Sequence, residues 1–257
     1  MNKENEPILS VKNITKSFGG LIAIHDVSFD LHQGELLGII GPNGSGKTTS
    51  INCITGFIRP ESGEIRFRGR DITRMAPHRI AGMGIGRTFQ IMRPYHTLPA
   101  FKNLIVPLFS SRAKKFVGGG KLGDRDAIAI DILEDVGFER DAHSLYKPAG
   151  ALPLGYLKRL ELARCIALKS DIMLCDEVLS GLSAAEIASM TPLLERLKKE
   201  GATLIMIEHR LRELFRIADR IIVLNFGVKI FDGNPEEAMK DKRVTEAYFG
   251  KGGEVVL

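Results

Sequence analysis

The stretch that most constrains the fold is Gly41-Pro42-Asn43-Gly44-Ser45-Gly46-Lys47-Thr48. It matches the phosphate-binding pattern G-x-x-x-x-G-K-[ST], in which successive backbone N–H groups surround an anion at the start of a helix. Residues 36–40 before it are apolar and β-compatible, and residues 49–55 after it have helical character up to a glycine. The motif therefore stands in the strand–loop–helix context that it needs, and the sequence predicts a nucleotide-binding protein.

Two side chains of this motif have chemistry of their own. Lys47 is expected to reach the β- and γ-phosphates, where it is also a candidate catalytic residue, and the Thr48 hydroxyl is expected to bind Mg²⁺. The predicted nucleotide-binding residues of the loop are Gly41, Pro42, Asn43, Gly44, Ser45, Gly46, Lys47, Thr48 and Thr49.

Composition narrows the class of protein. The chain has 257 residues, of which 44% are apolar and 26% charged, as is ordinary for a globular domain. It contains no apolar run near the ~20 residues that span a bilayer and no visible N-terminal signal, so we expect a cytosolic protein. Cys53, Cys165 and Cys175 lie in apolar surroundings and are expected to be buried free thiols. The net charge of +5 is mild and indicates a dispersed, solvated surface.

The first third of the chain alternates in short strands, over residues 8–14, 27–31 and 64–68, with glycines between them. Such spacing predicts a small antiparallel sheet. Residues 77–81 are expected to form a short helix, and residues 85–90 are strand-like. From 92 to about 169 the spacing becomes helical, with a clear helix over 156–168, and the polar stretch 110–126 is interpreted as a mobile surface loop.

Carboxylates follow a later strand. The apolar run 172–175 is typical of a buried central strand, and it ends on Asp176-Glu177. Because α/β sheets bind ligands at the carboxyl ends of their strands, Asp176 is expected to hold Mg²⁺. Glu177 is placed to take a proton from an attacking water, a role worth about 10²–10⁴-fold in rate. The next strand, 203–207, is followed by His209, a third candidate catalytic residue at the same edge.

Strands and helices alternate over the rest of the chain. A capping box at 183–186 opens a helix that ends near Gly201, and Asn234 is expected to cap another helix. The predicted fold class is α/β, a P-loop NTPase core with a mostly parallel sheet, a small antiparallel β subdomain and a helical subdomain. Residues 1–257 are interpreted as one domain, with the core at about 1–90 and 170–257 and the helical subdomain at about 91–169.

The order and spacing of these residues resemble the nucleotide-binding subunit of an ABC transporter over nearly the whole chain. The resemblance implies that Phe18 stacks on adenine and that His209 is the switch histidine. Gln90 corresponds to the glutamine that senses the γ-phosphate and Mg²⁺ where membrane subunits dock. Residues 180–183 match the D-loop, and residues 152–156 occupy the place of the LSGGQ signature, in which Leu154 and Gly155 supply backbone N–H groups.

Within the family, residues 86–90, 207–211 and 247–250 are similar to the ATPases of branched-chain amino acid importers. The signature departs from the family pattern, with proline for serine, leucine for the first glycine and tyrosine for glutamine; Val178 and Ser183 also replace the usual Walker B proline and D-loop aspartate. The departing residues are Pro153, Leu154, Tyr156, Val178 and Ser183.

The resemblance implies an ATP-hydrolysing subunit of an ABC importer for branched-chain or other amino acids, with ATP and Mg²⁺ as its cofactors. It implies a head-to-tail pair of ATPases, membrane permease subunits docked on residues 91–101, an extracytoplasmic solute-binding protein acting indirectly, and a cytoplasmic location on the inner face of the cell membrane. Because Pro153 has neither a hydroxyl nor an N–H to offer, we expect a heterodimer, with a homodimer as the alternative. No nucleic acid partner is expected.

Two other functions fit a P-loop chain. One is an ABC-type ATPase acting on nucleic acid or ribosomes, but such proteins typically carry two cassettes or a long coiled-coil insertion, and this sequence has neither. The other is a regulatory nucleotide binder without hydrolysis, which would have no need of Glu177.

Overall fold

The computed structural model describes residues 6–117, 122–140 and 143–249. The chain forms two compact units. The first unit comprises residues 1–80 and 195–257, and the second comprises residues 81–194. Two helices, α2 (Pro77–Met83) and α8 (Ala184–Lys199), cross the boundary in the sequence.

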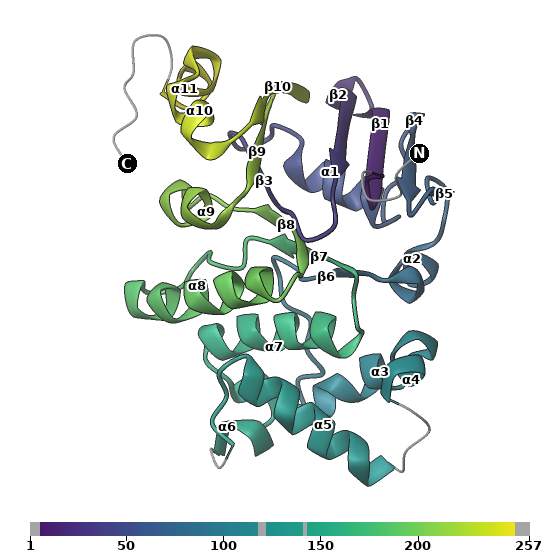
Figure 1. Cartoon of the computed structure of the whole chain (residues 1–257), viewed down its shortest axis with the longest axis vertical. Helices are drawn as coiled ribbons and strands as arrows, with labels where there is room; N and C mark the ends of the chain where they lie inside the picture. Colours follow the sequence, from purple (N-terminus) through teal and green to yellow (C-terminus); the bar gives the residue numbers. More distant parts are fainter. Residues whose placement is uncertain (1–5, 118–121, 141–142, 250–257) are drawn as a thin grey trace. The chain divides into compact units, whose positions relative to one another are not determined.

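An antiparallel sheet in the first unit has the strand order β2-β1-β4-β5 (Figure 1). Val11 on β1 lies opposite Phe29 on β2 and Ile65 on β4, and all three side chains are buried. The sheet confirms the small antiparallel subdomain predicted from the alternating pattern. Its strands are β1 (Leu9–Phe18), β2 (Leu21–Leu31), β4 (Ser62–Phe67) and β5 (Arg70–Asp71).

A second sheet of the first unit has β3 (Leu36–Ile40) between β8 (Thr203–Ile207) and β9 (Arg220–Asn225), parallel to both. The edge strand β10 (Val228–Gly233) is antiparallel to β9. Every residue of β3 and β8 is buried, as expected for parallel strands covered on both faces. At Gly38 a Cβ would lie 2.5 Å from Ile221 Cδ1 and 2.9 Å from Leu214 Cδ2, so a glycine lets helix α9 (Leu211–Ile217) pack closely.

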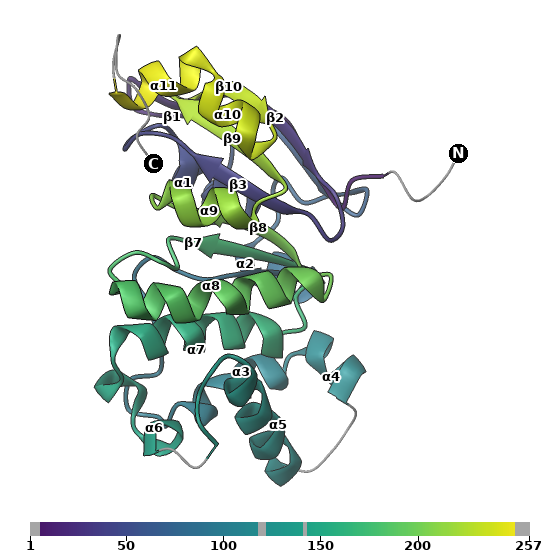
Figure 2. The same cartoon turned by 60° about the vertical axis from the view of Figure 1, so that its left-hand side comes forward.

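Two helices of the first unit begin near the residues that the sequence predicts, whereas α9 and the last helix were not predicted. Helix α1 (Lys47–Ile54) ends before Gly56, whose φ of +74° suits a glycine after a helix. Helix α10 (Pro235–Lys240) is capped by Asn234, whose Oδ1 accepts a hydrogen bond from Glu237 N at 2.8 Å. Figure 2 shows α10 and α11 (Lys242–Phe249) beside β10.

The second unit pairs two parallel strands, β6 (Ile85–Arg87) and β7 (Ile172–Asp176). One ion pair lies at each end of this strand pair: Arg112 Nη2 contacts Asp171 Oδ1 at 2.6 Å beside the amino ends, and Arg87 Nη2 contacts Asp176 Oδ2 at 2.9 Å at the carboxyl ends. The remaining named elements between β6 and β7 are helical, as predicted. They are η2 (Phe101–Leu104), α3 (Ile105–Leu108), α4 (Ser111–Val117), α5 (Leu122–Asp135), α6 (His143–Tyr146), η3 (Ala149–Ala151) and α7 (Leu154–Ala167).

The prediction of a mobile loop over residues 110–126 is wrong, because this stretch contains α4 and the start of α5. Ser110 caps α4 by accepting a hydrogen bond from Ala113 N at 3.1 Å, and Ala113 is buried. Arg125 is also buried; its guanidinium stacks 3.9 Å from the centroid of the Phe109 ring and donates to Leu108 O. The polar composition thus belongs to helices with buried anchors. Within this stretch, Gly118, Gly119 and Gly120 lie outside the described residues.

The three cysteines are free and buried, as predicted. Burial raises the pKa of the Cys165 thiol to about 12 and that of Cys53 to about 11. Among the described residues, no helix is both long and apolar enough to cross a membrane.

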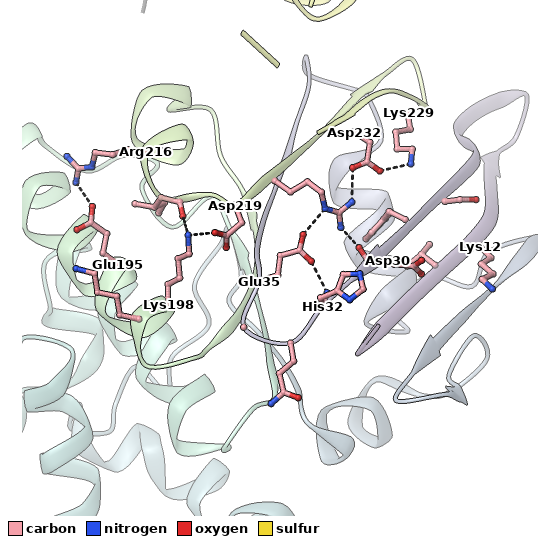
Figure 3. A pocket seen from close by; sticks show the side chains of 18 residues that line it. Lys12, Asp30, His32, Glu35, Glu195, Lys198, Arg216, Asp219, Lys229 and Asp232 are labelled. Carbon is pink, nitrogen blue, oxygen red and sulfur yellow. Dashed lines mark hydrogen bonds and ion pairs between the residues drawn. The ribbon is translucent and has the colours of Figure 1, made fainter. Parts of the chain in front are cut away.

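A hollow of about 1360 Å³ opens in the first unit and is lined by charged side chains (Figure 3). It lies at the amino ends of β3 and β9, the edge opposite the phosphate-binding loop. Arg220 contacts Glu35 and Asp232, each at 2.7 Å, and donates to the Asp30 carbonyl oxygen. Lys198 pairs with Asp219 at 2.6 Å. Because these charges pair with one another, we interpret the ion pairs that line the hollow as a structural cluster that joins β2, β3, β9 and β10.

Replacing Arg220 with methionine should destabilise the chain, because Glu35 and the Asp30 carbonyl lose their shared donor. We expect the free energy of unfolding to fall by about 1.5–3 kcal/mol. The matched control is Arg216→Met, which breaks the more exposed pair with Glu195 and should cost no more than about 0.5 kcal/mol. Urea unfolding of both variants measures the difference. Equal losses would contradict the structural role of Arg220.

Candidate functional site

The phosphate-binding loop lies between a buried strand and a helix. β3 ends at Ile40, the loop spans residues 41–46, and α1 begins at Lys47. Gly46 is the N-terminal cap of α1, and Thr48 is exposed in the first turn. The free N–H groups at this helix start, together with the loop amides, are the donors from which the predicted anion site would be built.

Two polar side chains of the loop, Lys47 and Ser45, are buried. The Lys47 ammonium donates to the carbonyl oxygens of Gly41 at 2.7 Å and Pro42 at 2.9 Å, so its charge lies inside the loop. The Ser45 hydroxyl is buried and has no hydrogen-bond partner among the described residues. A buried polar atom without a partner is costly, and a bound phosphate or hydrated cation would supply one.

Two loop positions require glycine. A Cβ at Gly41 would lie 2.1 Å from the Leu224 carbonyl oxygen. A Cβ at Gly46, where φ is +101°, would lie 2.5 Å from the Ala23 carbonyl oxygen. The strand β9 and the strand β2 therefore approach the loop so closely that side chains are excluded, and this close approach explains the glycines of the motif.

Phe18 and His209 also belong to the first unit. The Phe18 ring, at the end of β1, is 48% exposed, with the Lys16 ammonium 5.3 Å from its centroid. An exposed aromatic face can stack on a base. His209 is exposed two residues after β8. Because Ile39 on β3 is in register with Ile207 on β8, the loop and His209 leave the sheet at the same edge.

Sequence reasoning missed Tyr248 as a neighbour of the loop. This residue of α11 is hydrogen-bonded to the backbone of Gly41, and burial raises the pKa of its phenol to about 12, against the lowering effect of that bond. Because the two residues are 207 positions apart in the chain (248 minus 41), no local pattern could indicate the contact.

The carboxylate Asp176 ends β7 in the second unit and is buried. One of its oxygens, Oδ2, contacts Arg87 of the neighbouring strand, while its N–H donates to Thr88 Oγ1 at 3.1 Å. The other oxygen, Oδ1, is buried with no hydrogen-bond partner in the described part of the chain. Such an oxygen suits a hard cation with its water shell, so the residues present fit Mg²⁺.

Glu177 is the next residue and has a left-handed backbone, with φ of +53°. This conformation costs a non-glycine residue about 1–2 kcal/mol and marks functional sites more often than others. Gln90 Nε2 donates to Glu177 Oε2 at 2.9 Å. The buried Lys158 Nζ donates to the Glu177 carbonyl oxygen at 2.7 Å. The structure thus brings together Gln90, Asp176 and Glu177, all three predicted site residues; Arg87 and Lys158 were missed.

The signature segment forms the first turn of α7, with Pro153 as an N-cap that makes no side-chain hydrogen bond. Ser183 and Glu186 form the predicted capping box, with Glu186 Oε2 accepting from Ser183 N at 2.8 Å. These bonds from Ser183, followed by one from the Gly155 backbone, hold the pKa of Glu186 below its usual value. A carboxylate therefore already occupies part of the helix start where Leu154 and Gly155 are expected to meet a phosphate.

The residues after Gln90 are tied to α7. Arg164 donates to the Arg93 carbonyl oxygen at 3.2 Å, pairs with Glu161 at 2.7 Å, and lies 5.7 Å from the centroid of the Tyr95 ring. Ile91, Tyr95 and Leu98 are exposed apolar side chains in this stretch. The backbone is thus held while apolar side chains remain available for a partner.

Comparison with known proteins gives a consistent result. Residues 24–180 match the family model described as ABC transporter. The chain is 35% identical over 256 residues to the high-affinity branched-chain amino acid transport ATP-binding protein BraF of Pseudomonas aeruginosa, covering 96% of this chain and 99% of BraF. It is 34% identical over 258 residues to the corresponding protein LivG of Escherichia coli K12, again covering 96% and 99%.

Solved structures agree in fold. The ADP conformation of MJ1267, an ATP-binding cassette of an ABC transporter, is 32% identical with a TM-score of 0.82, covering 96% of this chain and all of that chain. The dimeric structure of MJ0796, a bacterial ABC transporter cassette, is 26% identical with a TM-score of 0.78, covering 88% of this chain and 98% of that chain. The predicted α/β fold class is therefore confirmed.

Replacing Gly46 with alanine should unfold the loop region, because the added Cβ meets the Ala23 carbonyl as well as an unfavourable φ. We expect the free energy of unfolding of the nucleotide-free chain to fall by about 3 kcal/mol or more. Gly44→Ala is the matched control: φ there is +77°, and no atom lies within 4 Å of the new Cβ. It should cost only the strain of about 1 kcal/mol. Similar losses in urea unfolding would show that β2 does not press on the loop.

Proposed function

The chain belongs to the ABC transporter family, and from that membership we propose that it is the ATP-hydrolysing subunit of an importer for branched-chain or related amino acids. The substrate class is supported by the names of BraF and LivG. The observation that carries hydrolysis is the carboxylate pair at the end of β7, where Asp176 keeps one buried oxygen without a partner and Glu177 is held in a strained backbone. The relatives found are transport subunits, so the nucleic-acid alternative has no support.

Each site residue receives a role in this proposal. The loop 41–49 binds the phosphates, Lys47 neutralises the β- and γ-phosphate charge, and Phe18 stacks on adenine. Thr48, Gln90 and Asp176 would hold Mg²⁺, which when bound neutralises the charge that develops on the phosphates. Glu177 takes a proton from the attacking water while the water oxygen bonds to the γ-phosphorus and the bond from that phosphorus to the β–γ bridging oxygen breaks. His209 donates a hydrogen bond to the γ-phosphate oxygens, and Leu154 and Gly155 would bind the partner subunit's nucleotide.

The partners follow from the same family membership. We propose that membrane permease subunits dock on residues 91–101, where Ile91, Tyr95 and Leu98 offer apolar contact. The chain would thus work at the inner face of the cell membrane, with an extracytoplasmic solute-binding protein acting through the permeases. A second ABC ATPase completes the pair, consistent with the dimeric cassette of MJ0796.

Glu177→Gln should bind ATP and lose hydrolysis by about 10²-fold or more, because the amide keeps the shape and cannot accept the proton. The measurement is phosphate release by the assembled transport complex, with ATP binding followed in parallel. Glu134→Gln makes the same change at a surface carboxylate that pairs with Arg140 and should leave turnover unchanged. Near-normal turnover of Glu177→Gln would rule out its role as the base.

Purified alone, the chain should hydrolyse ATP slowly and dimerise poorly, because Pro153 offers a partner nucleotide neither hydroxyl nor N–H and the Gly155 backbone already binds Glu186. A lost hydrogen bond to a charged group is worth about 1.5–3 kcal/mol. The ATPase rate against protein concentration measures this. The matched variant restores the family signature with Pro153→Ser, Leu154→Gly and Tyr156→Gln, and should turn over faster at the same concentration. Brisk, cooperative turnover of the unaltered chain would contradict the heterodimer.

A further inference from the structure

Lys158 is a buried cation on α7 for which the proposed reaction has no role. Its side chain is 4% exposed, and its ammonium donates to the Glu177 carbonyl oxygen at 2.7 Å. Burying an ammonium is costly unless polar groups meet it, so this position is held for a reason other than packing. Among the acceptors that it could have met, it contacts the backbone of the residue assigned as the general base.

The direction of the Glu177 carbonyl group depends on the backbone dihedral angles of that residue, so a contact to its oxygen restrains them. Within the described part of the chain, its oxygen accepts a hydrogen bond from Lys158 Nζ at 2.7 Å and one from Ser180 N at 3.2 Å. With φ of +53°, Glu177 is in a conformation that β-carbon-bearing residues rarely keep unless neighbours hold it there. A carbonyl fixed by a buried charge is such a restraint. The other end of the residue is directed by Gln90, which donates to Oε2.

Lys158 also belongs to the first turns of α7. It lies four residues after Leu154, so the two are on the same face of the helix, and Leu157 N donates to the Pro153 carbonyl oxygen at 3.1 Å across that turn. A displacement of the first turn therefore moves Lys158 with it, since a hydrogen-bonded turn moves as one piece. The Gly155 backbone in the same turn is bonded to Glu186.

We propose that Lys158 is a positioning residue, which holds Glu177 in its left-handed conformation and links the first turn of α7 to the general base. This inference rests on the proposed role of Glu177. In the assembled pair of ATPases, a partner's nucleotide that contacts Leu154 and Gly155 would then change the position of this chain's own base. The link uses backbone and one buried side chain, and it requires no movement of the phosphate-binding loop.

The test replaces Lys158 with methionine, which keeps the length of the stem and removes the donor. In the assembled complex we expect kcat to fall by about 10–100-fold, which is less than the 10²–10⁴-fold of a lost general base because the carboxylate itself remains. The KM for ATP should change less than about threefold because the phosphate-binding residues are untouched. Lys158→Arg, which restores a donor, should recover at least several-fold of that loss. The matched control is Arg159→Met, the next residue on α7, whose guanidinium contacts Ser189 Oγ at 2.9 Å and the Val136 carbonyl.

A double mutant separates positioning from general damage. In the Glu177→Gln background, Lys158→Met should lower the residual kcat by less than about twofold, because a residue that acts through the base has nothing left to position. Arg159→Met should have the same small effect in both backgrounds. A full multiplicative loss would overturn the proposal, as would a Lys158→Met enzyme with normal kcat beside an inactive Glu177→Gln enzyme. If Glu177→Gln itself turns over normally, the proposed function of Glu177 fails, and that outcome is distinct.

Hydrogen exchange gives a readout that needs no turnover. Ser180 N–H donates to the same carbonyl as Lys158, so its exchange reports the direction of that carbonyl. In the nucleotide-free chain, Lys158→Met should speed exchange at Ser180 by about tenfold or more, since that carbonyl is then free to turn, and Arg159→Met should not. Unchanged exchange in Lys158→Met would show that Glu177 keeps its backbone without Lys158 and would overturn the inference.

Discussion

The parallel hydrogen bonding of β3 to β8 and β9 is the constraint on which the first unit depends. All five residues of β3 are buried, so its register cannot shift without exposing the core. That register determines where the chain leaves the sheet at Gly41 and therefore where α1 begins. Gly38 contributes by its missing side chain, because Ile221 and Leu214 fill the space that a Cβ would need. The phosphate-binding loop is thus the end of a rigid strand rather than an independent element.

In the second unit, side-chain contacts rather than a long buried strand position the predicted site residues. Its strand β6 has only three residues, so little backbone hydrogen bonding holds it. Polar contacts, most of them buried, hold the ends of these strands: Arg87 and Thr88 contact Asp176, while Gln90 and Lys158 contact Glu177. Such groups are stable only when their partners are present, and Asp176 Oδ1, a buried oxygen without a hydrogen-bond partner among the described residues, is suited to meet a bound ligand.

The sequence predicts the elements whose signal is local. The loop 41–48, the strand before Asp176, the capping box at 183–186 and the cap at Asn234 all lie within a few residues of what they determine. The sequence does not predict elements that depend on tertiary contacts. Residues 110–126 have the composition of a loop, but they contain helices anchored by the buried Ala113 and Arg125. The sequence is also silent on Arg87 with Asp176, 89 residues apart, and on Tyr248 with Gly41, because a single sequence carries no trace of such pairings.

The two ion pairs at the ends of β6 and β7 have a consequence for the descent of this chain. Losing Arg87 leaves the buried Asp176 carboxylate without its cation, at a cost of about 3–5 kcal/mol, which is a large share of the stability of an ordinary domain. The cost is smaller for the Arg112–Asp171 pair, whose side chains are 12% and 18% exposed. In evolution, the Arg87–Asp176 or Arg112–Asp171 pair can therefore be replaced only if both residues change or if other substitutions have first raised the stability. Since the proposed chemistry requires Asp176, substitution of Arg87 is restricted as well, although Arg87 is not assigned a contact with the nucleotide. Diverged relatives should thus differ at Arg112 and Asp171 together, while Arg87 changes only where hydrolysis has been lost.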